Sequence, residues 1–254
     1  MPIAQKIKEL LMPEARKTGI KDIRIGLTYT AVLLENDQAG VALTFHEGMR
    51  RGCDIFTGLQ PLAGRKASEL LAFLDSAHKI EVAVALATAN ALANTMRESL
   101  LEGDIMDYIH ILPEDTVGMV GYSAPLVPRL KKKTSSILIF EQNKQQLEQK
   151  QDDLLPEEDA YRHLPQCQVA IITSTSILNH TVDNILDAAR SCRDIALLGA
   201  STPLLPDAFA GTPTTILSGV VVSKPREILQ IVSEGGGMRF FKKNVIKVNL
   251  PLCK

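Results

Sequence analysis

The spacing of apolar residues changes once along this chain, near position 104, and divides it into two parts of different pattern. Before that point strands precede helices, and residues 35–40 have the composition of a hairpin turn. The periodicity predicts a helix over 3–17, strands over 22–28, 30–34 and 41–45, and helices over 67–74 and 80–96. Strands followed by helices are typical of an α+β unit.

After position 104, apolar strands alternate with amphipathic helices. Strands are predicted over 116–121, 135–140, 168–173, 194–198 and 215–222, with a last antiparallel edge strand over 245–248. Helices are predicted over 126–133, over 181–189 and after Pro225, and the polar segment 142–163 is interpreted as a solvated crossover. Continuous apolar strands of this kind favour a mostly parallel sheet that is covered on both faces.

The fold prediction is therefore α/β. A Rossmann-like, mostly parallel domain is expected over 104–254, preceded by a smaller α+β domain over 1–103. The charges of the 28 basic and 29 acidic residues of the whole chain nearly cancel, so the net charge of −1 indicates no attraction to nucleic acid. The apolar stretch 82–96 is too short to span a membrane. We expect a cytoplasmic protein with a small-molecule ligand, without nucleic-acid or membrane partners, and we leave a homo-oligomer open.

Glu141 is the most informative single residue. It ends the predicted strand that follows the glycine turn at Gly121, about 20 positions further along the chain. A carboxylate at this spacing binds the ribose of a nucleotide in Rossmann-type sheets. The glycine motif is incomplete, however, because Gly118 and Gly121 are its only spaced pair. A tight turn explains Gly121 equally well, and a solvated loop position explains Glu141 equally well.

Small and polar residues follow the predicted strands, and ligands of open α/β sheets bind beyond the carboxyl ends of the strands. The candidate ligand-binding residues are Asn90, Gly121, Tyr122, Ser123, Glu141, Ser174, Thr175, Asn179, His180, Gly199, Ser201, Gly235 and Gly236. Thr181 is predicted as a helix N-cap and Gly235 as the residue after a helix end. The three consecutive glycines indicate a close backbone approach or a mobile flap. Asn90 must be hydrogen-bonded, either to neighbouring backbone or in a cleft.

The loop over 46–64 supplies further candidates from the first part of the chain. His46 and Cys53 are not at a recognised metal-ligand spacing, so the metal ligands stay unassigned. The guanidinium groups of the loop are suited to a carboxylate or phosphate. The residues expected to face a cleft from this side are Arg50, Arg51, Cys53 and Asp54.

Several strings of this sequence resemble a family known as the heavy-metal chelation domain, long labelled as of unknown function. They are VGMVGYSAP, ITSTSILNHTVDNIL, LLGASTPLLPDAF, LSGVVV and SEGGG, within 104–248. ATANAL, at 87–92, resembles the small domain that precedes it, which is similar to the N-terminal domain of enolases. The resemblance implies heavy-metal chelation and a site between the two domains. It places there Asn90, Gly121, Glu141, Asn179, Ser201 and Gly236.

Three functions follow as hypotheses. The first is binding or processing of a small organic chelator or its metal complex in the interdomain cleft, with a heavy-metal ion or chelate as the bound group. The alternative is an enzyme that uses S-adenosylmethionine or NAD, with Glu141 as anchor. The third is a metal carrier that uses Cys53 or His46, with uptake that releases protons. The sequence assigns no catalytic residue and leaves the enzymatic status open.

Overall fold

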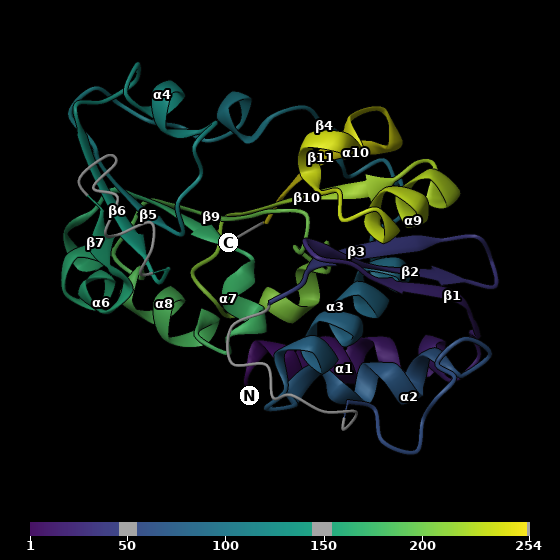
Figure 1. Cartoon of the computed structure of the whole chain (residues 1–254). Coiled ribbons are helices and arrows are strands. Elements are labelled where there is room, and N and C mark those ends of the chain that lie inside the picture. Colours follow the sequence, from purple (N-terminus) through teal and green to yellow (C-terminus); the bar gives the residue numbers. More distant parts are fainter. Residues whose placement is uncertain (46–54, 144–153, 253–254) are drawn as a thin grey trace.

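The computed structural model describes residues 1–45, 55–143 and 154–252, and it contains two sheets (Figure 1). The strands of the small antiparallel sheet are, in order, β1 (Ile20–Ile25), β2 (Tyr29–Leu34) and β3 (Ala39–Leu43). The strands of the large sheet are, along the chain, β4 (Leu101–Glu102), β5 (Thr116–Val120), β6 (Ser136–Glu141), β7 (Leu155–Pro156), β8 (Val169–Thr173), β9 (Asp194–Leu198), β10 (Ile216–Val222) and β11 (Val245–Pro251). In space they follow the order β4-β11-β10-β9-β8-β5-β6-β7.

Helices cover both sheets. The α-helices are α1 (Ile3–Ala15), α2 (Ala67–Leu71), α3 (Lys79–Ala93), α4 (Val127–Leu130), α6 (Ala160–His163), α7 (Thr175–Leu178), α8 (Val182–Ala188), α9 (Pro225–Ser233) and α10 (Met238–Phe241). The 3₁₀ helices are η1 (Ala72–Asp75), η2 (Ile105–Asp107), η3 (Glu157–Asp159), η4 (Leu164–Gln166), η5 (Pro206–Phe209) and η6 (Lys242–Asn244). The described helices include none with the length and apolar character that crossing a membrane requires.

The large sheet is mostly parallel, as the alternating pattern predicts. Strands from β10 to β7 run parallel, and β11 joins β10 in antiparallel fashion. The prediction that this last strand forms the edge is wrong, because the two-residue β4 pairs with its outer side. Strands as short as β4 and β7 are too brief for a period-two pattern, so the sequence does not reveal them. The segment with η2 and α4 covers one face, and α6 and α8 cover the other.

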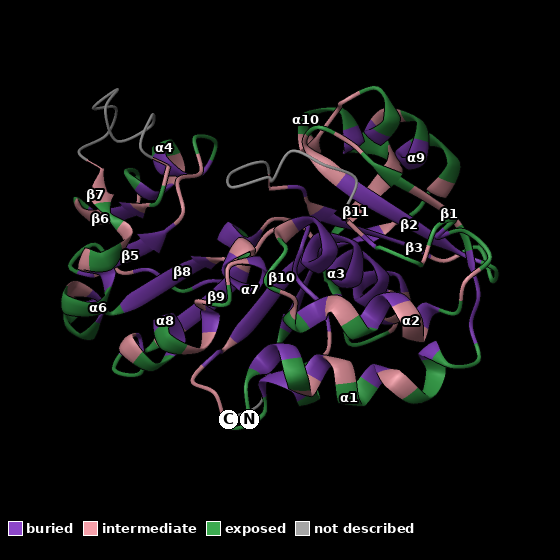
Figure 2. Cartoon of the chain, turned by 60° about the horizontal axis from the view of Figure 1, so that its bottom comes forward, coloured by how far each residue is buried: buried purple, intermediate pink, exposed green. Residues whose placement is uncertain are grey.

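The small sheet lies between α3 and α9, so both of its faces are buried. On β2, Val32 and Leu34 belong to the same core as α3, whereas Leu33 packs with Ile228 and Leu229 of α9. This explains why β2 is apolar at nearly every position instead of alternating. Helix α3 is itself buried on all sides, between the small sheet and α1 and α2 (Figure 2). A helix that is apolar all round is expected to be buried in this way.

The two parts of the chain are tied together by polar contacts as well as by a shared core. Asn94, which follows α3, donates to the carbonyls of Thr202 and Val220 and accepts from the Leu204 amide. The Ser201 hydroxyl accepts from the amide of Leu43, at the end of β3. One hydrophobic cluster includes residues from α1 and α3 and from β5, β6 and β8. The division at 103/104 and the enolase-like character of the first part stay predictions.

Candidate functional site

A cavity of about 440 Å³ lies at the carboxyl ends of β5, β6, β8 and β9. The chain runs outward from β5 to β6 and β7, and then returns to the opposite side of β5 as β8. The strand order therefore reverses between β5 and β8, and such a reversal is where open α/β sheets bind ligands. Residues of the small sheet close the cavity from the other side, with Tyr29, Leu43 and Phe45 in its lining.

The turn after β5 is held by Gly121 and Glu141. Gly121 has φ +86°, and a Cβ there would lie 2.6 Å from Cγ2 of Thr173. A glycine is thus required both by the left-handed backbone and by the neighbouring strand. The Glu141 carboxylate accepts from the backbone amides of Tyr122, Gln142 and Asn143, each at 2.8 Å. This carboxylate fixes the two loops that border the cavity.

The segment after β8 supplies hydroxyl and amide groups to the cavity. The hydroxyls of Thr173 and Thr175 lie 2.9 Å apart, and the Ser176 hydroxyl donates to the Thr173 carbonyl. Asn179 donates through Nδ2 to Oε1 of Gln142 at 2.9 Å. Its Oδ1 is buried and accepts no hydrogen bond from the described residues. Unsatisfied buried amide oxygens of this kind are few in folded proteins.

The cavity lining includes polar residues that are absent from the sequence-based candidates, among them Gln142, Asn143, Thr173, Glu157 and Tyr29. Glu157 opens η3 and lies in the lining, although its segment was interpreted as a solvated crossover. Burial, together with the nearby Glu141 carboxylate, raises the pKa of Glu157. Tyr29 begins β2, and burial raises its pKa to about 12. Pro156 before three acidic residues was the available signal for Glu157; for Tyr29 there was none, because only the packing of the sheets brings it here.

The structure brings seven of the thirteen candidate residues to this cavity. They are Gly121, Tyr122, Ser123, Glu141, Thr175, Asn179 and Gly199. They come from four successive strand ends, as the rule for open sheets predicts. Their role in ligand binding stays a prediction.

The other candidates lie elsewhere. Asn90 donates to the Val41 carbonyl, so it joins α3 to β3, which is the backbone alternative. Ser174 is buried with its hydroxyl against Gly199. His180 has φ +58° and its ring Nε2 lies 3.0 Å from the Ser76 carbonyl oxygen, outside the cavity lining.

The glycine run and Thr181 have structural roles. The amides of Gly235 and Gly236 donate to Val232 and Ile231, so these glycines terminate α9 in a Schellman motif, as predicted for Gly235. The run also approaches the β1–β2 turn, because Thr28 donates to the Gly235 carbonyl. Thr181 stands at the N-cap position of α8, but the predicted cap bond is absent, since its backbone is already helical.

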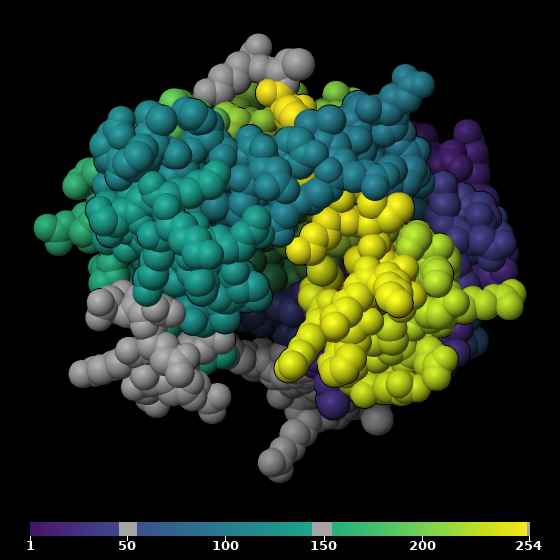
Figure 3. All heavy atoms as spheres, turned by 90° about the horizontal axis from the view of Figure 1, so that it is seen from above, coloured from purple at the N-terminus to yellow at the C-terminus, as the bar shows by residue number. Residues whose placement is uncertain are grey.

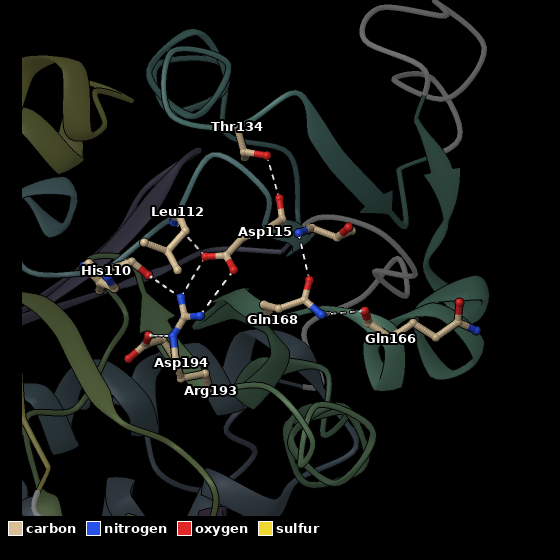
Figure 4. A network of polar contacts seen from close by, with 9 residues as sticks. His110, Leu112, Asp115, Thr134, Gln166, Gln168, Arg193 and Asp194 are labelled. Atoms are coloured by element: carbon tan, nitrogen blue, oxygen red, sulfur yellow. Dashed lines mark hydrogen bonds and ion pairs between the residues drawn. The ribbon is translucent and has the colours of Figure 1, made fainter.

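A second polar cluster lies at the opposite ends of the same strands, where Asp115, Gln168 and Arg193 precede β5, β8 and β9, and its members are hydrogen-bonded to one another (Figure 4). Arg193 donates to both carboxylate oxygens of Asp115 and to the His110 carbonyl. The same carboxylate accepts from the Leu112 amide, and Gln168 joins the starts of β5 and β8. The buried Asp115 carboxylate, paired in this way with the partly exposed Arg193, holds the strands in register and leaves no open ligand position among the described residues of the cluster.

The described residues contain no group of three or more His, Cys, Asp or Glu side chains that could hold a metal ion. The loop candidates Arg50, Arg51, Cys53 and Asp54, together with His46, lie outside the described residues. The buried thiols of Cys167 and Cys192 have their pKa raised by burial, to about 11 and about 12.

The sequence and the structure of this chain are similar to those of several known proteins. A model of the DUF364 family, described as "Putative heavy-metal chelation", matches residues 104–251, and a DUF4213 model with the same description matches residues 8–93. An uncharacterized protein of Methanocaldococcus jannaschii is 27% identical, over 94% of each chain. A crystal structure of a DUF364 protein of unknown function from Pyrococcus horikoshii has a TM-score of 0.86 and 25% identity, over 98% of this chain and 100% of that chain. Another from Desulfitobacterium hafniense has a TM-score of 0.79 at 20% identity, over 98% of each chain.

Proposed function

The chain belongs to the DUF364 family, described as "Putative heavy-metal chelation", and on this premise we propose that its cavity binds or processes a small organic chelator or the metal complex of one. The cavity volume of about 440 Å³ is within the range of small-molecule sites. Carboxylates, hydroxyls and an amide face it from several strand ends. This mixture suits a polar molecule that needs many hydrogen bonds.

The observation that carries the proposal is a buried oxygen on a residue of the cavity lining: Oδ1 of Asn179 accepts no hydrogen bond from the described residues. A buried acceptor without a partner costs roughly 1–3 kcal/mol. A ligand that donates an N–H or O–H group to this oxygen removes that cost, so the site gains affinity for polar molecules. Since Nδ2 is fixed by Gln142, the amide is already oriented with Oδ1 available.

A chelator supplies the metal-ligating groups that the described lining lacks. No cluster of three metal-ligating side chains is present among the described residues, whereas a metal bound by an organic molecule brings its own donors. Glu141 and Glu157 then act on the metal ion that the complex carries or on the polar groups of the chelator. The carrier hypothesis with Cys53 or His46 concerns residues outside the described part of the chain.

The nucleotide-cofactor alternative is not favoured. Both oxygens of Glu141 already accept backbone amides, which is a different use from a bidentate ribose contact. In addition, the turn after β5 carries Tyr122 and Ser123 where a diphosphate cradle has glycines.

A thermal-shift and calorimetric titration tests the proposal with Ni²⁺ alone, citrate alone and the Ni²⁺–citrate complex. The complex is expected to stabilise the protein more than either component does. At a concentration of 100 times its dissociation constant, it should raise the free energy of unfolding by about 2.7 kcal/mol. Asn179→Ala should weaken this binding about tenfold, since a buried hydrogen bond is lost. Mass analysis of the chelator after incubation separates binding from processing.

The matched control is Glu158→Gln, which changes an exposed carboxylate beside Glu157 and outside the cavity lining. It should bind like the wild type. Stabilisation by Ni²⁺ alone that is indifferent to Asn179→Ala would count against a chelator site in this cavity.

A further inference from the structure

A second cavity of about 580 Å³ adjoins the first one. Five residues line both cavities, namely Tyr29, Ser123, Leu126, Leu198 and Gly199. Seen from above, the surface is hollowed between the teal segment that includes α4 and the yellow C-terminal segment (Figure 3). A ligand seated at the strand ends therefore lies next to a second hollow that reaches toward α10.

The two cavities carry opposite charge. The described lining of the first contains Glu141 and Glu157 and no basic side chain. The described lining of the second contains three basic residues and one acidic residue, Asp104. The walls of the second cavity are mostly apolar, so its charges act over a longer range than charges on an open surface.

The basic end has positive charge in excess. Arg129 and Lys247 share the Asp104 carboxylate, with Nη1 at 2.6 Å from Oδ1 and Nζ at 3.3 Å from Oδ2. One carboxylate thus serves two cations. Arg239 on α10 is exposed and has no hydrogen-bond or ion-pair partner in the described part of the chain. Its guanidinium is available for a carboxylate or a phosphate.

Tyr29 lies where the two cavities meet. Its ring is packed edge-on against Phe241, with centroids 5.1 Å apart, so its position is fixed. Its hydroxyl has no hydrogen-bond partner among the residues that the structure describes. A fixed, unused donor between the two charged ends is suited to a polar group in the middle of a ligand.

We propose that the two cavities together form one site for a dipolar ligand. A cationic group, either an ammonium or a chelated metal ion, lies against Glu141 and Glu157. A carboxylate or phosphate of the same molecule lies against Arg239. The connecting chain passes Tyr29 between the apolar side chains of Leu126 and Leu198. This inference rests on the proposed function and defines the class of molecule that the site takes.

Three probes of equal chain length test the charge pattern by calorimetry: 6-aminohexanoate, hexanoate and hexylamine. The zwitterion is expected to bind about tenfold more tightly than either single-charge probe, because it alone pairs both ends. Comparison with 6-aminohexyl phosphate shows which anion is preferred. Equal affinity for the zwitterion and hexylamine would overturn the anionic subsite.

Two variants assign the ends. Arg239→Gln should weaken 6-aminohexanoate and hexanoate by about tenfold and leave hexylamine unchanged. Glu157→Gln should weaken 6-aminohexanoate and hexylamine instead. Lys243→Gln, an exposed basic residue outside both linings, is the control and should match the wild type. An unchanged hexanoate affinity in Arg239→Gln would contradict the assignment.

The probes separate this inference from the proposed function. If Ni²⁺–citrate binds and requires Asn179 while the zwitterion has no advantage, the dipolar site is wrong and the chelator site stands. If the zwitterion binds as the charges predict and no chelate binds, the dipolar site stands and the chelator is wrong. Failure of every probe rejects both.

Discussion

The Glu141 carboxylate accepts the backbone amide of Tyr122 at 2.8 Å, so the residue that ends β6 fastens the turn that follows β5. The same side chain also accepts from two amides of its own loop. The carboxylate therefore builds one wall of the cavity before any ligand arrives. A pre-built wall reduces the ordering cost of binding.

Glu141→Ala should lower the free energy of unfolding by roughly 2 kcal/mol, because three amides lose a charged acceptor that water replaces only in part. Glu141→Gln should lose less, since its amide oxygen still accepts. Urea denaturation at pH 7 measures both changes. Glu158→Ala is the control, and an equal effect at that exposed position would show that Glu141 does not hold the turn.

Gly121→Ala should cost roughly 2–3 kcal/mol, because the left-handed backbone and the contact with Thr173 act together. Gly211→Ala is a matched comparison, since Gly211 has φ +77° and open space around it. It should cost about 1 kcal/mol, which is the backbone contribution. Thermal unfolding of both variants measures the difference. Equal costs would mean that Thr173 yields to the added methyl group.

Asp115 and Arg193 predict a pH-dependent contribution to stability. The Arg193 guanidinium lowers the pKa of the Asp115 carboxyl below its ordinary value of 3.8. A carboxyl with a lower pKa in the folded state stabilises the protein above its unfolded pKa, and this is lost as pH falls through the folded value. The advantage of wild type over Arg193→Met should thus be present at pH 6 and shrink below pH 3.8.

At pH 6 the Arg193→Met variant should be less stable by roughly 3 kcal/mol, because the Asp115 side chain is 2% exposed and keeps its charge without a cation. Asp115→Asn should cost less, since the Arg193 side chain is 41% exposed and can be hydrated. Chemical denaturation between pH 3 and pH 6 checks both statements. A constant difference across this range would contradict the linkage.

Glu157→Gln should leave the ligand-free protein as stable as wild type, or up to about 1 kcal/mol more stable, at pH 7. Burial and the Glu141 carboxylate raise the pKa of Glu157 above its ordinary value of 4.5. A carboxyl with a raised folded pKa contributes stability below its unfolded pKa and loses it as pH rises through the folded value. Any gain in the variant should therefore vanish below pH 4.5. A clear loss of stability at pH 7 would indicate a structural role for Glu157.

Much of the fold was available from the sequence. The mostly parallel large sheet and its main strands are present in the structure. These features arise from local periodicity, which each segment carries by itself. Ligands of open α/β sheets bind beyond the carboxyl ends of the strands, and this rule predicted that Gly121, Glu141 and Asn179 lie near one another. All three line the same cavity.

The sequence by itself determined which residues stand at the strand ends, and the tertiary structure decided what each one contacts. The His180 ring lies 3.0 Å from the Ser76 carbonyl oxygen because of the turn at His180. Asn90 donates to the Val41 carbonyl because α3 packs against β3. Tyr29 reaches the cavity because the small sheet packs against the large one. Such contacts join positions far apart in the chain, so they depend on packing between elements that no local pattern encodes.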